Sequence, residues 1–239
     1  DPSFEVEDFE TSLGALSVPN PYFPMATGNI WVYGGDEEIM VEVLDETKLI
    51  DDITCFVVRD VVSEDGFLVE DTDDWFAVNR NDGGIWYCGE EVKDFEYFEG
   101  DEPMLPELIA IDGSFKVERD GDRAGVIFPG YPQVGDVFRQ GFSLGNAEDI
   151  GEIVSTNYHY GEDDELDQLV PQALAEQLCN YDCVIVAEYT PIEPGVFEYK
   201  FYARGIGFFL GINPEDEEVV YLTGCNFNSA CDSLPTEED

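Results

Sequence analysis

Short runs in which apolar and polar residues alternate follow one another from residue 29 onward, which is the pattern of β-strands with one buried face. Turn sequences separate the runs, such as SEDG at 63–66 and NDGG at 81–84. An Asp-Gly pair between two alternating runs is a strong signal for a β-hairpin. The pattern therefore predicts a three-stranded meander over residues 53–91. The expected strands are 30–33, 38–44, 53–62, 67–78, 85–91, 114–118, 125–128, 136–140, 152–157, 184–190, 196–203, 207–212 and 219–223.

One segment, 165–178, has helical spacing instead. Its apolar residues fall on one stripe of a helix, and they are Leu166, Leu169, Val170, Leu174 and Leu178. Pro171 either sits in the first turn of this helix or divides the segment. The pattern predicts a single helix within an otherwise β-rich chain.

The order of these elements predicts an all-β fold, built as a curled antiparallel sheet or an open barrel with one helical insertion. We expect an acidic N-terminal arm at 1–20, a single β-rich domain at 21–224 with the insertion at about 162–180, and a cysteine-containing acidic tail at 225–239. The arm is either an unstructured terminus or a strand that pairs with a sheet edge, on this molecule or on a neighbouring copy.

The charge of the chain restricts its partners. Asp and Glu number 55 against 10 Lys and Arg, so the formal net charge at pH 7 is −45. Such a field repels nucleic acid and anionic lipid, and no apolar run of the length of a membrane span is present. The hydrophobic fraction of 44% is ample for a folded core. We expect either a high-salt environment or bound cations to offset the repulsion.

The cysteines indicate export. Their number is even, and two close pairs, Cys179/Cys183 and Cys225/Cys231, favour disulfides over a zinc site. The spacing leaves the pairing of all six cysteines open. The chain begins at Asp1, as a processed exported chain would. We therefore expect an extracellular or cell-surface location.

Several short sequences resemble one known family. They are NPYFP at 20–24 with Gly28 and WVY at 31–33, TCFVVRD at 54–60, EDT at 70–72 with DW at 74–75, IWY at 85–87 with GE at 89–90, and PGV at 194–196 with EYK at 198–200. Together they resemble a family of exported, functionally uncharacterised microbial β-rich proteins. The resemblance implies export and a β fold, and no reaction. The helical insertion, the arm, the tail and Cys88, where an aromatic residue would be usual, indicate a specialised member.

Two groups of carboxylates are candidate metal ligands. If the 81–84 turn centres on residues 81 and 82, Asp73 faces Glu90 across the hairpin, with Asp71 on the same face. These three residues form a candidate Ca²⁺ site, because Ca²⁺ binds six to eight oxygen atoms. Asp163 and Asp164 belong to a second acidic cluster before the helix. The alternatives are a solvated acidic face for the first group and helix capping for the second.

The remaining chemistry points away from catalysis. The phosphate-loop, GxGxxG and GxSxG motifs are absent from the sequence, and the single histidine, His159, is expected at the surface. The aromatic residues of the strands are expected mainly in the core, or alternatively around a ligand cavity. They are Trp31, Tyr33, Trp75, Trp86 and Tyr87. We therefore expect a non-enzymatic protein.

These observations predict a secreted, salt-adapted β protein that acts as a cation-binding surface or structural module, with Ca²⁺ as the cation. The N-terminal arm would allow it to assemble with other copies of itself into an extracellular polymer. The alternative function is a β-barrel carrier that binds a hydrophobic small molecule or peptide.

Overall fold

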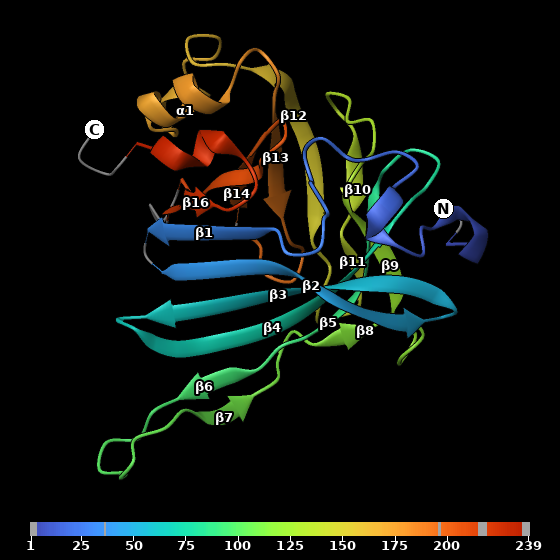
Figure 1. Ribbon diagram of the computed structural model, residues 1–239, viewed down its shortest axis with the longest axis vertical. Coiled ribbons are helices and arrows are strands. Elements are labelled where there is room, and N and C mark those ends of the chain that lie inside the picture. Colours follow the sequence, from blue (N-terminus) through green and yellow to red (C-terminus); the bar gives the residue numbers. More distant parts are fainter. Residues whose placement is uncertain (1–3, 36, 196, 215–218, 236–239) are drawn as a thin grey trace.

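The structure is a computed structural model that describes residues 4–35, 37–195, 197–214 and 219–235. Its main feature is one antiparallel sheet that curls into a nearly closed barrel (Figure 1). Strands hold 49% of the residues and helical turns 9%. The predicted all-β class with one helical insertion is confirmed.

The first half of the sheet begins with strands that are consecutive in the sequence and ends with two later strands. They are β1 (Ile30–Gly35), β2 (Glu38–Ile50), β3 (Ile53–Glu64), β4 (Phe67–Val78) and β5 (Ile85–Glu91), followed by β9 (Arg123–Phe128) and β11 (Gly141–Phe142). The predicted meander over 53–91 is confirmed as β3, β4 and β5.

The second half continues from the other edge of β1. In order, it contains β16 (Val219–Cys225), β15 (Gly207–Ile212), β14 (Phe197–Ala203), β13 (Cys183–Tyr189), β12 (Ile150–Tyr158) and β10 (Val137–Arg139). Because β10 contacts β9, the two halves approach each other and enclose a common interior.

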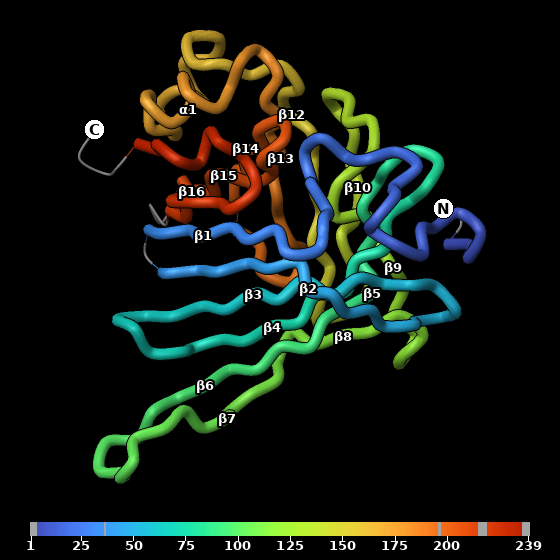
Figure 2. The backbone as a smooth tube through the Cα atoms, viewed as in Figure 1, coloured from blue at the N-terminus to red at the C-terminus, as the bar shows by residue number. Residues whose placement is uncertain are grey.

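Three short strands lie off this path. They are β6 (Asp94–Glu96), β7 (Glu107–Ala110) and β8 (Phe115–Lys116). The β6–β7 hairpin projects from the barrel (Figure 2) and was not among the predicted strands.

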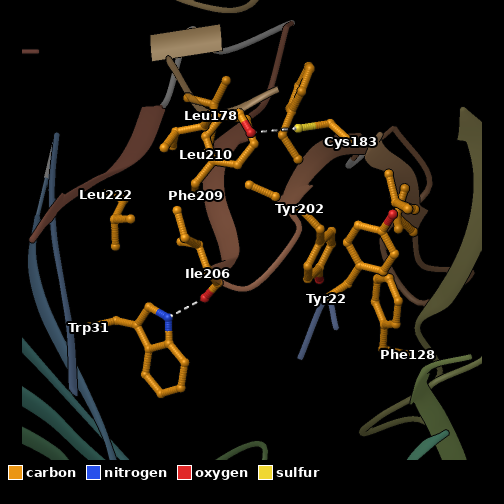
Figure 3. Packing of buried hydrophobic residues seen from close by; sticks show 14 of the residues in the cluster. Tyr22, Trp31, Phe128, Leu178, Cys183, Tyr202, Ile206, Phe209, Leu210 and Leu222 are labelled. Carbon is orange, nitrogen blue, oxygen red and sulfur yellow. Dashed lines mark hydrogen bonds between the residues drawn. The ribbon is translucent and has the colours of Figure 1, made fainter. Parts of the chain in front are cut away.

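The main core fills much of the barrel interior. Phe201, Phe209 and Leu222 are fully buried there, and the indole Nε1 of Trp31 donates a hydrogen bond of 2.7 Å to the carbonyl oxygen of Ile206 (Figure 3). A buried indole N–H needs such an acceptor. These contacts come from both halves of the sheet and hold the barrel together.

A second, smaller core lies on the outer face of β3, β4 and β5, around Trp75 and Trp86. The N-terminal arm covers it. The rings of Phe4 and Phe9 lie 5.5 and 5.7 Å from the ring of Trp86, and the amide of Glu10 donates to the carbonyl oxygen of Val78 at 2.9 Å. The described part of the arm, which includes the 3-10 turns η1 (Val6–Asp8) and η2 (Leu13–Ala15), therefore packs on its own barrel.

The predicted helical segment 165–178 forms two pieces, which is the second of the two possibilities for Pro171. They are the 3-10 turn η3 (Leu166–Gln168) and the helix α1 (Gln172–Leu178). Pro171 divides them and stands as the N-cap of α1 with ψ at 120°. A proline that has no N–H ends a preceding helix and begins the next one readily. Leu166, Leu174 and Leu178 are buried as the stripe predicts.

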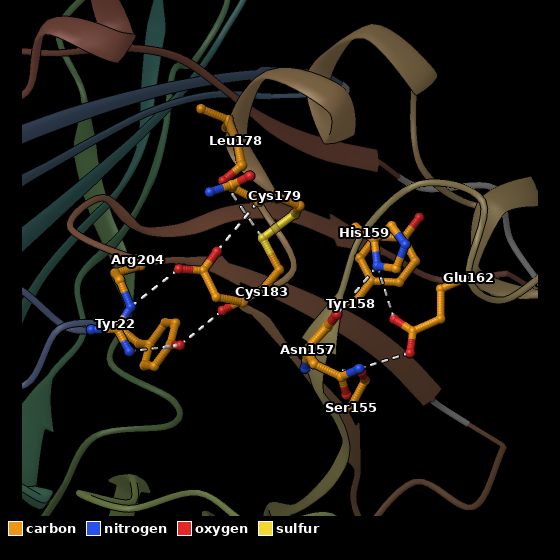
Figure 4. The surroundings of a disulfide bond; sticks show 12 residues. Tyr22, Ser155, Asn157, Tyr158, His159, Glu162, Leu178, Cys179, Cys183 and Arg204 are labelled. Atoms are coloured by element: carbon orange, nitrogen blue, oxygen red, sulfur yellow. Dashed lines mark hydrogen bonds and ion pairs between the residues drawn. A yellow bond between two sulfur atoms is a disulfide. The ribbon is translucent and has the colours of Figure 1, made fainter.

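All six cysteines are paired, as Cys55–Cys88, Cys179–Cys183 and Cys225–Cys231. The expected disulfides are confirmed in place of zinc ligands. Cys179–Cys183 connects the end of α1 to the start of β13 (Figure 4). Cys225–Cys231 connects β16 to the 3-10 turn η4 (Ser229–Ser233), and residues 236–239 of the predicted tail lie outside the described residues. The described part of the chain has no helix long and apolar enough to cross a membrane.

Candidate functional site

A cavity of about 270 Å³ lies in the barrel interior. Its walls come from strands on both sides of the barrel, from β1 through β4 and from β13 through β16. Most lining side chains are apolar or aromatic, and they include Trp31, Tyr33, Val41, Val58, Phe76 and Phe208. A concave apolar wall with a few polar groups is the usual form of a small-molecule site.

Two of the aromatic residues, Trp31 and Tyr33, belong to the main core as expected and also line this cavity. Trp75 and Trp86 belong to the outer core instead.

The polar groups of the cavity form two sets. The first is electrostatically paired. Lys200 on β14 lies 2.6 Å from Glu188 and 3.4 Å from Glu198, and Gln140 Nε2 donates to Glu188 Oε1 at 2.5 Å. Burial alone would lower the pKa of Lys200, but the carboxylates of Glu188 and Glu198 hold it well above its usual value. Lys200 therefore stays charged and bound to these two carboxylates.

The second set lies on β4 and β5. Asp74 stands directly opposite Glu90 in the ladder, and the hydroxyl of Tyr87 donates to Asp74 Oδ1 at 2.5 Å. Burial raises the pKa of Asp74 to about 6, and burial together with the charge of Asp74 raises the pKa of Glu90 to about 8. Two opposed carboxylates repel each other, so this pair holds protons at a pH where exposed carboxylates are ionised.

Asp60 on β3 completes the second set. Val58, two residues before Asp60 on β3, pairs with Asp74 on β4. Asp60 therefore lies diagonally from Asp74 on the same face of the sheet. Asp60 Oδ1 is buried and has no hydrogen-bond partner among the described residues. Burial, followed by the charges of Asp74 and Glu70, raises the pKa of Asp60 to about 8. A buried acceptor without a partner is rare and needs a physical explanation.

A β-bulge decides which carboxylates face inward. The β4–β5 register shifts between Trp75, opposite Gly89, and Phe76, opposite Tyr87. The expected pairing of Asp73 with Glu90 is therefore wrong: Asp73 stands opposite Glu91, and Asp74 stands opposite Glu90. A shift of one residue turns a side chain to the other face of a sheet.

The structure separates the first group of predicted metal ligands. Asp71 and Asp73 lie on the outer face of β4, where both oxygens of Asp71 accept hydrogen bonds of 2.7 Å from Arg59. The guanidinium of Arg59 lowers the pKa of Asp71. Glu90 lies on the inner face with Asp74. The three residues are therefore not brought together.

The second group has capping contacts. Asp163 Oδ1 accepts hydrogen bonds from the amides of Glu165 and Leu166, at 2.9 and 3.2 Å, and the carbonyl of Asp164 accepts one from Gln168. Over the described residues, no group of three or more His, Cys, Asp or Glu side chains is arranged to hold a metal ion. Calcium binding at either group stays a prediction.

Asp60, Asp74, Glu188 and Lys200 were not expected to be site residues from the sequence pattern. A signal for Asp60 was present, because it shares the alternation phase of the apolar residues Phe56 and Val58. A carboxylate at an apolar-phase position of a strand is a candidate for an inward-facing group.

A larger hollow of about 450 Å³ lies outside the barrel, beside Trp86 and Phe142. Two arginines stack on the ring of Phe142, with Arg123 at 5.0 Å and Arg139 at 5.4 Å. Arg139 also reaches Glu148 at 3.5 Å. Unlike the interior cavity, this hollow contains no buried side-chain nitrogen or oxygen without a partner among the described residues. The interior cavity is therefore the stronger candidate site.

Comparisons of the chain with protein-family models, with curated proteins and with solved structures found no match. The family resemblance noted from the sequence stays a prediction.

Proposed function

We propose that this protein is a binding protein that carries a small organic molecule in the cavity of its barrel. The observation that supports this proposal is the wall of the cavity, where an apolar and aromatic lining surrounds buried polar groups, one of which lacks a partner. Protein interiors are normally close-packed and their polar atoms hydrogen-bonded. Here a cavity and a buried oxygen without a hydrogen-bond partner in the described part of the chain occur at the same place, and a bound ligand would account for both.

The size of the cavity favours a small molecule over a peptide. Its volume of about 270 Å³ is near the lower limit of typical ligand sites. A peptide would need an open groove or an unpaired sheet edge. Of the two occupants expected for a barrel carrier, the small molecule is therefore the better fit.

The disulfides support a carrier that works outside the cell. All six cysteines are paired, and disulfides persist in oxidising compartments. The charge of −45 suits a salt-rich medium. Surface binding of Ca²⁺ and assembly through the arm remain separate hypotheses. Thermal melting with CaCl₂ and EDTA tests the first, and light scattering of the chain with and without the arm tests the second.

Filling the cavity tests the proposal. Val41 lines the cavity, and Val32 on the neighbouring strand is 41% exposed, so Val41→Phe and Val32→Phe are a matched pair. Native mass spectrometry of wild-type protein, purified from its source without unfolding, should detect a bound organic mass. The Val32→Phe variant should retain it and the Val41→Phe variant should lose it. The proposal would be contradicted if the wild-type protein had the mass of the polypeptide alone and bound none of a panel of small amphiphiles.

A further inference from the structure

We infer that the ligand of the barrel cavity is a small organic cation, with an ammonium group beside Asp60 and Asp74 and an apolar body against the aromatic wall. This inference rests on the proposed function and specifies the ligand class.

The balance of charge around the cavity is the first argument. The carboxylates of Asp60, Asp74 and Glu188 line it, and Glu90 stands opposite Asp74. Lys200 is the only basic residue in the lining of this cavity, and it is bound to Glu188 and Glu198. The carboxyl groups of Asp60, Asp74 and Glu90, on β3, β4 and β5, therefore have no ion pair to a basic residue within the described part of the chain. Burying a carboxylate without a cation is costly, so these three groups favour a positively charged ligand.

The unpartnered oxygen is the second argument. Asp60 Oδ1 is a buried acceptor that lacks a donor among the described residues, and its residue lines the cavity. An ammonium group supplies hydrogen-bond donors to this oxygen and a positive charge that stabilises the ionised form of Asp60. A neutral alcohol would supply a donor but would not stabilise the ionised form of Asp60, whose pKa burial raises to about 8.

The aromatic lining is the third argument. Trp31, Tyr33, Phe76 and Phe208 line the cavity. The polar atoms of Trp31 and Tyr33 already make hydrogen bonds within the protein. Trp31 Nε1 donates to Ile206, and the Tyr33 hydroxyl donates to the carbonyl of Phe208 at 3.2 Å. Their rings are therefore available for apolar contact and for cation–π attraction to an ammonium group.

The same features disfavour a bare metal ion. Calcium needs six to eight oxygen ligands, and no described group of three or more acidic side chains is arranged around a common point. The rest of the lining is largely carbon. The acidic surface would raise the local concentration of any cation, so selectivity has to come from the cavity itself.

Calorimetric titration with three matched probes tests the inference: phenethylammonium, the neutral phenethyl alcohol and the anionic hydrocinnamate. Butylammonium and tetramethylammonium extend the cationic set. Salt at about 0.5 M screens the unspecific attraction of the surface. We expect one of the ammonium ions to bind at least tenfold more tightly than the alcohol, and the anion to bind most weakly. Binding should also release protons near neutral pH, because the cation favours the ionised form of the carboxyl groups beside it.

Two variants identify the group that recognises the cation. Asp60→Asn removes the carboxylate with little change in shape, and Glu46→Gln makes the same kind of change at an exposed position of β2. Asp60→Asn should weaken ammonium binding at least tenfold, and Glu46→Gln should leave it unchanged. Asp74→Asn replaces Asp60→Asn if the latter does not fold, as judged by circular dichroism.

The outcomes separate the two proposals. If the alcohol binds as tightly as every ammonium ion, the inference is wrong and the carrier proposal stands. If CaCl₂ binds, no ammonium ion does, and Asp60→Asn abolishes the calcium signal, the cavity is a metal site and the inference is wrong. If no probe of any charge binds and the native protein carries no organic mass, both proposals fail.

Discussion

Asp74 lies directly opposite Glu90 on the inner face of the barrel, and the hydroxyl of Tyr87 donates a hydrogen bond to Asp74. Facing carboxylates destabilise a sheet unless a proton or a cation offsets their charges. Here burial raises the pKa of Asp74 to about 6 and that of Glu90 to about 8, so the pair retains a proton at neutral pH. This relationship depends on the bulge beside Gly89, and both the stability of that bulge and the pH dependence of the protein follow from it.

The first prediction concerns that bulge. Gly89 has φ at +129°, and a Cβ there would lie 2.3 Å from the carbonyl oxygen of Phe115. Gly89→Ala should therefore lower the free energy of unfolding by about 2–4 kcal/mol. Gly224→Ala is the matched control, because a Cβ at that strand position meets nothing within 4 Å. Equal stability of the two variants in urea denaturation would show that the bulge is not needed.

The second prediction concerns pH. Burial raises the pKa of Asp60 and Glu90 to about 8 and of Asp74 to about 6, so between about pH 4 and 8 the folded protein binds more protons than the unfolded chain. The free energy of unfolding of ligand-free protein should thus fall by about 2–5 kcal/mol as the pH rises through this window. Besides one another, the groups that shift the pKa values of these three are Glu37, Glu70, Asp73, Asp149, Lys200 and Tyr87.

Denaturation in urea at about pH 5 and pH 8, at fixed ionic strength, measures this slope. The double variant Asp60→Asn/Glu90→Gln should flatten it, and Glu46→Gln should not. Stability that rises with pH over this window would contradict the assigned protonation states. Asp71 affects stability in a different pH range. Arg59 lowers the pKa of Asp71, so the stabilisation from this pair is lost as the pH falls through the folded pKa of Asp71.

The third prediction ranks two disulfides. Cys55–Cys88 closes a sequence separation of 33 residues, and Cys179–Cys183 closes one of 4. Replacing both cysteines of the first pair with Ala should cost about 4 kcal/mol, and replacing those of the second about 2 kcal/mol, because the longer loop restricts the unfolded chain more. Denaturant midpoints of the two double variants give the comparison. The reverse order would mean that strain or residual unfolded structure dominates.

The fourth prediction concerns the anionic surface. With a formal charge of −45, the melting midpoint should rise by several degrees between low salt and molar NaCl, since salt screens the repulsion. Calcium hypothesised at Asp71 and Asp73 should raise the midpoint in low salt beyond the effect of NaCl at equal ionic strength, and EDTA should reverse it. An identical midpoint with CaCl₂ and with NaCl would remove the calcium hypothesis.

The fifth prediction concerns the N-terminal arm. Phe9 is 2% exposed and packs on Trp86, so Phe9→Ala should cost about 3–4 kcal/mol and should shift tryptophan fluorescence to longer wavelength. Val6→Ala is the control, because Val6 is 49% exposed. Light scattering of the full chain and of a chain without residues 1–18 tests assembly. A monomer in both would end the polymer hypothesis.

The sequence predicted the strands well, because the alternation within a segment such as 67–78 reflects local burial. It also predicted the turns at 63–66 and 81–84, because the preference of Asp and Gly for tight turns depends only on residues close in the chain. It left open whether Pro171 divides the helical segment, and it missed the β6–β7 hairpin. It also assigned the hairpin 67–91 the wrong register, because the position of a β-bulge depends on packing against a third strand. The carbonyl of Phe115 approaches Gly89 closely in that packing.

The sequence by itself determined the β architecture, the disulfide chemistry of the cysteines and the anionic character of the surface, since each follows from composition or from neighbours close in the chain. Only the tertiary structure decided that Cys55 pairs with Cys88 and that Asp60, Asp74, Glu188 and Lys200 line one cavity. These residues are far apart in the chain and are brought together by the closure of the barrel. Which carboxylates face inward depends on a register shift of one residue, and that shift is a property of the packed sheet.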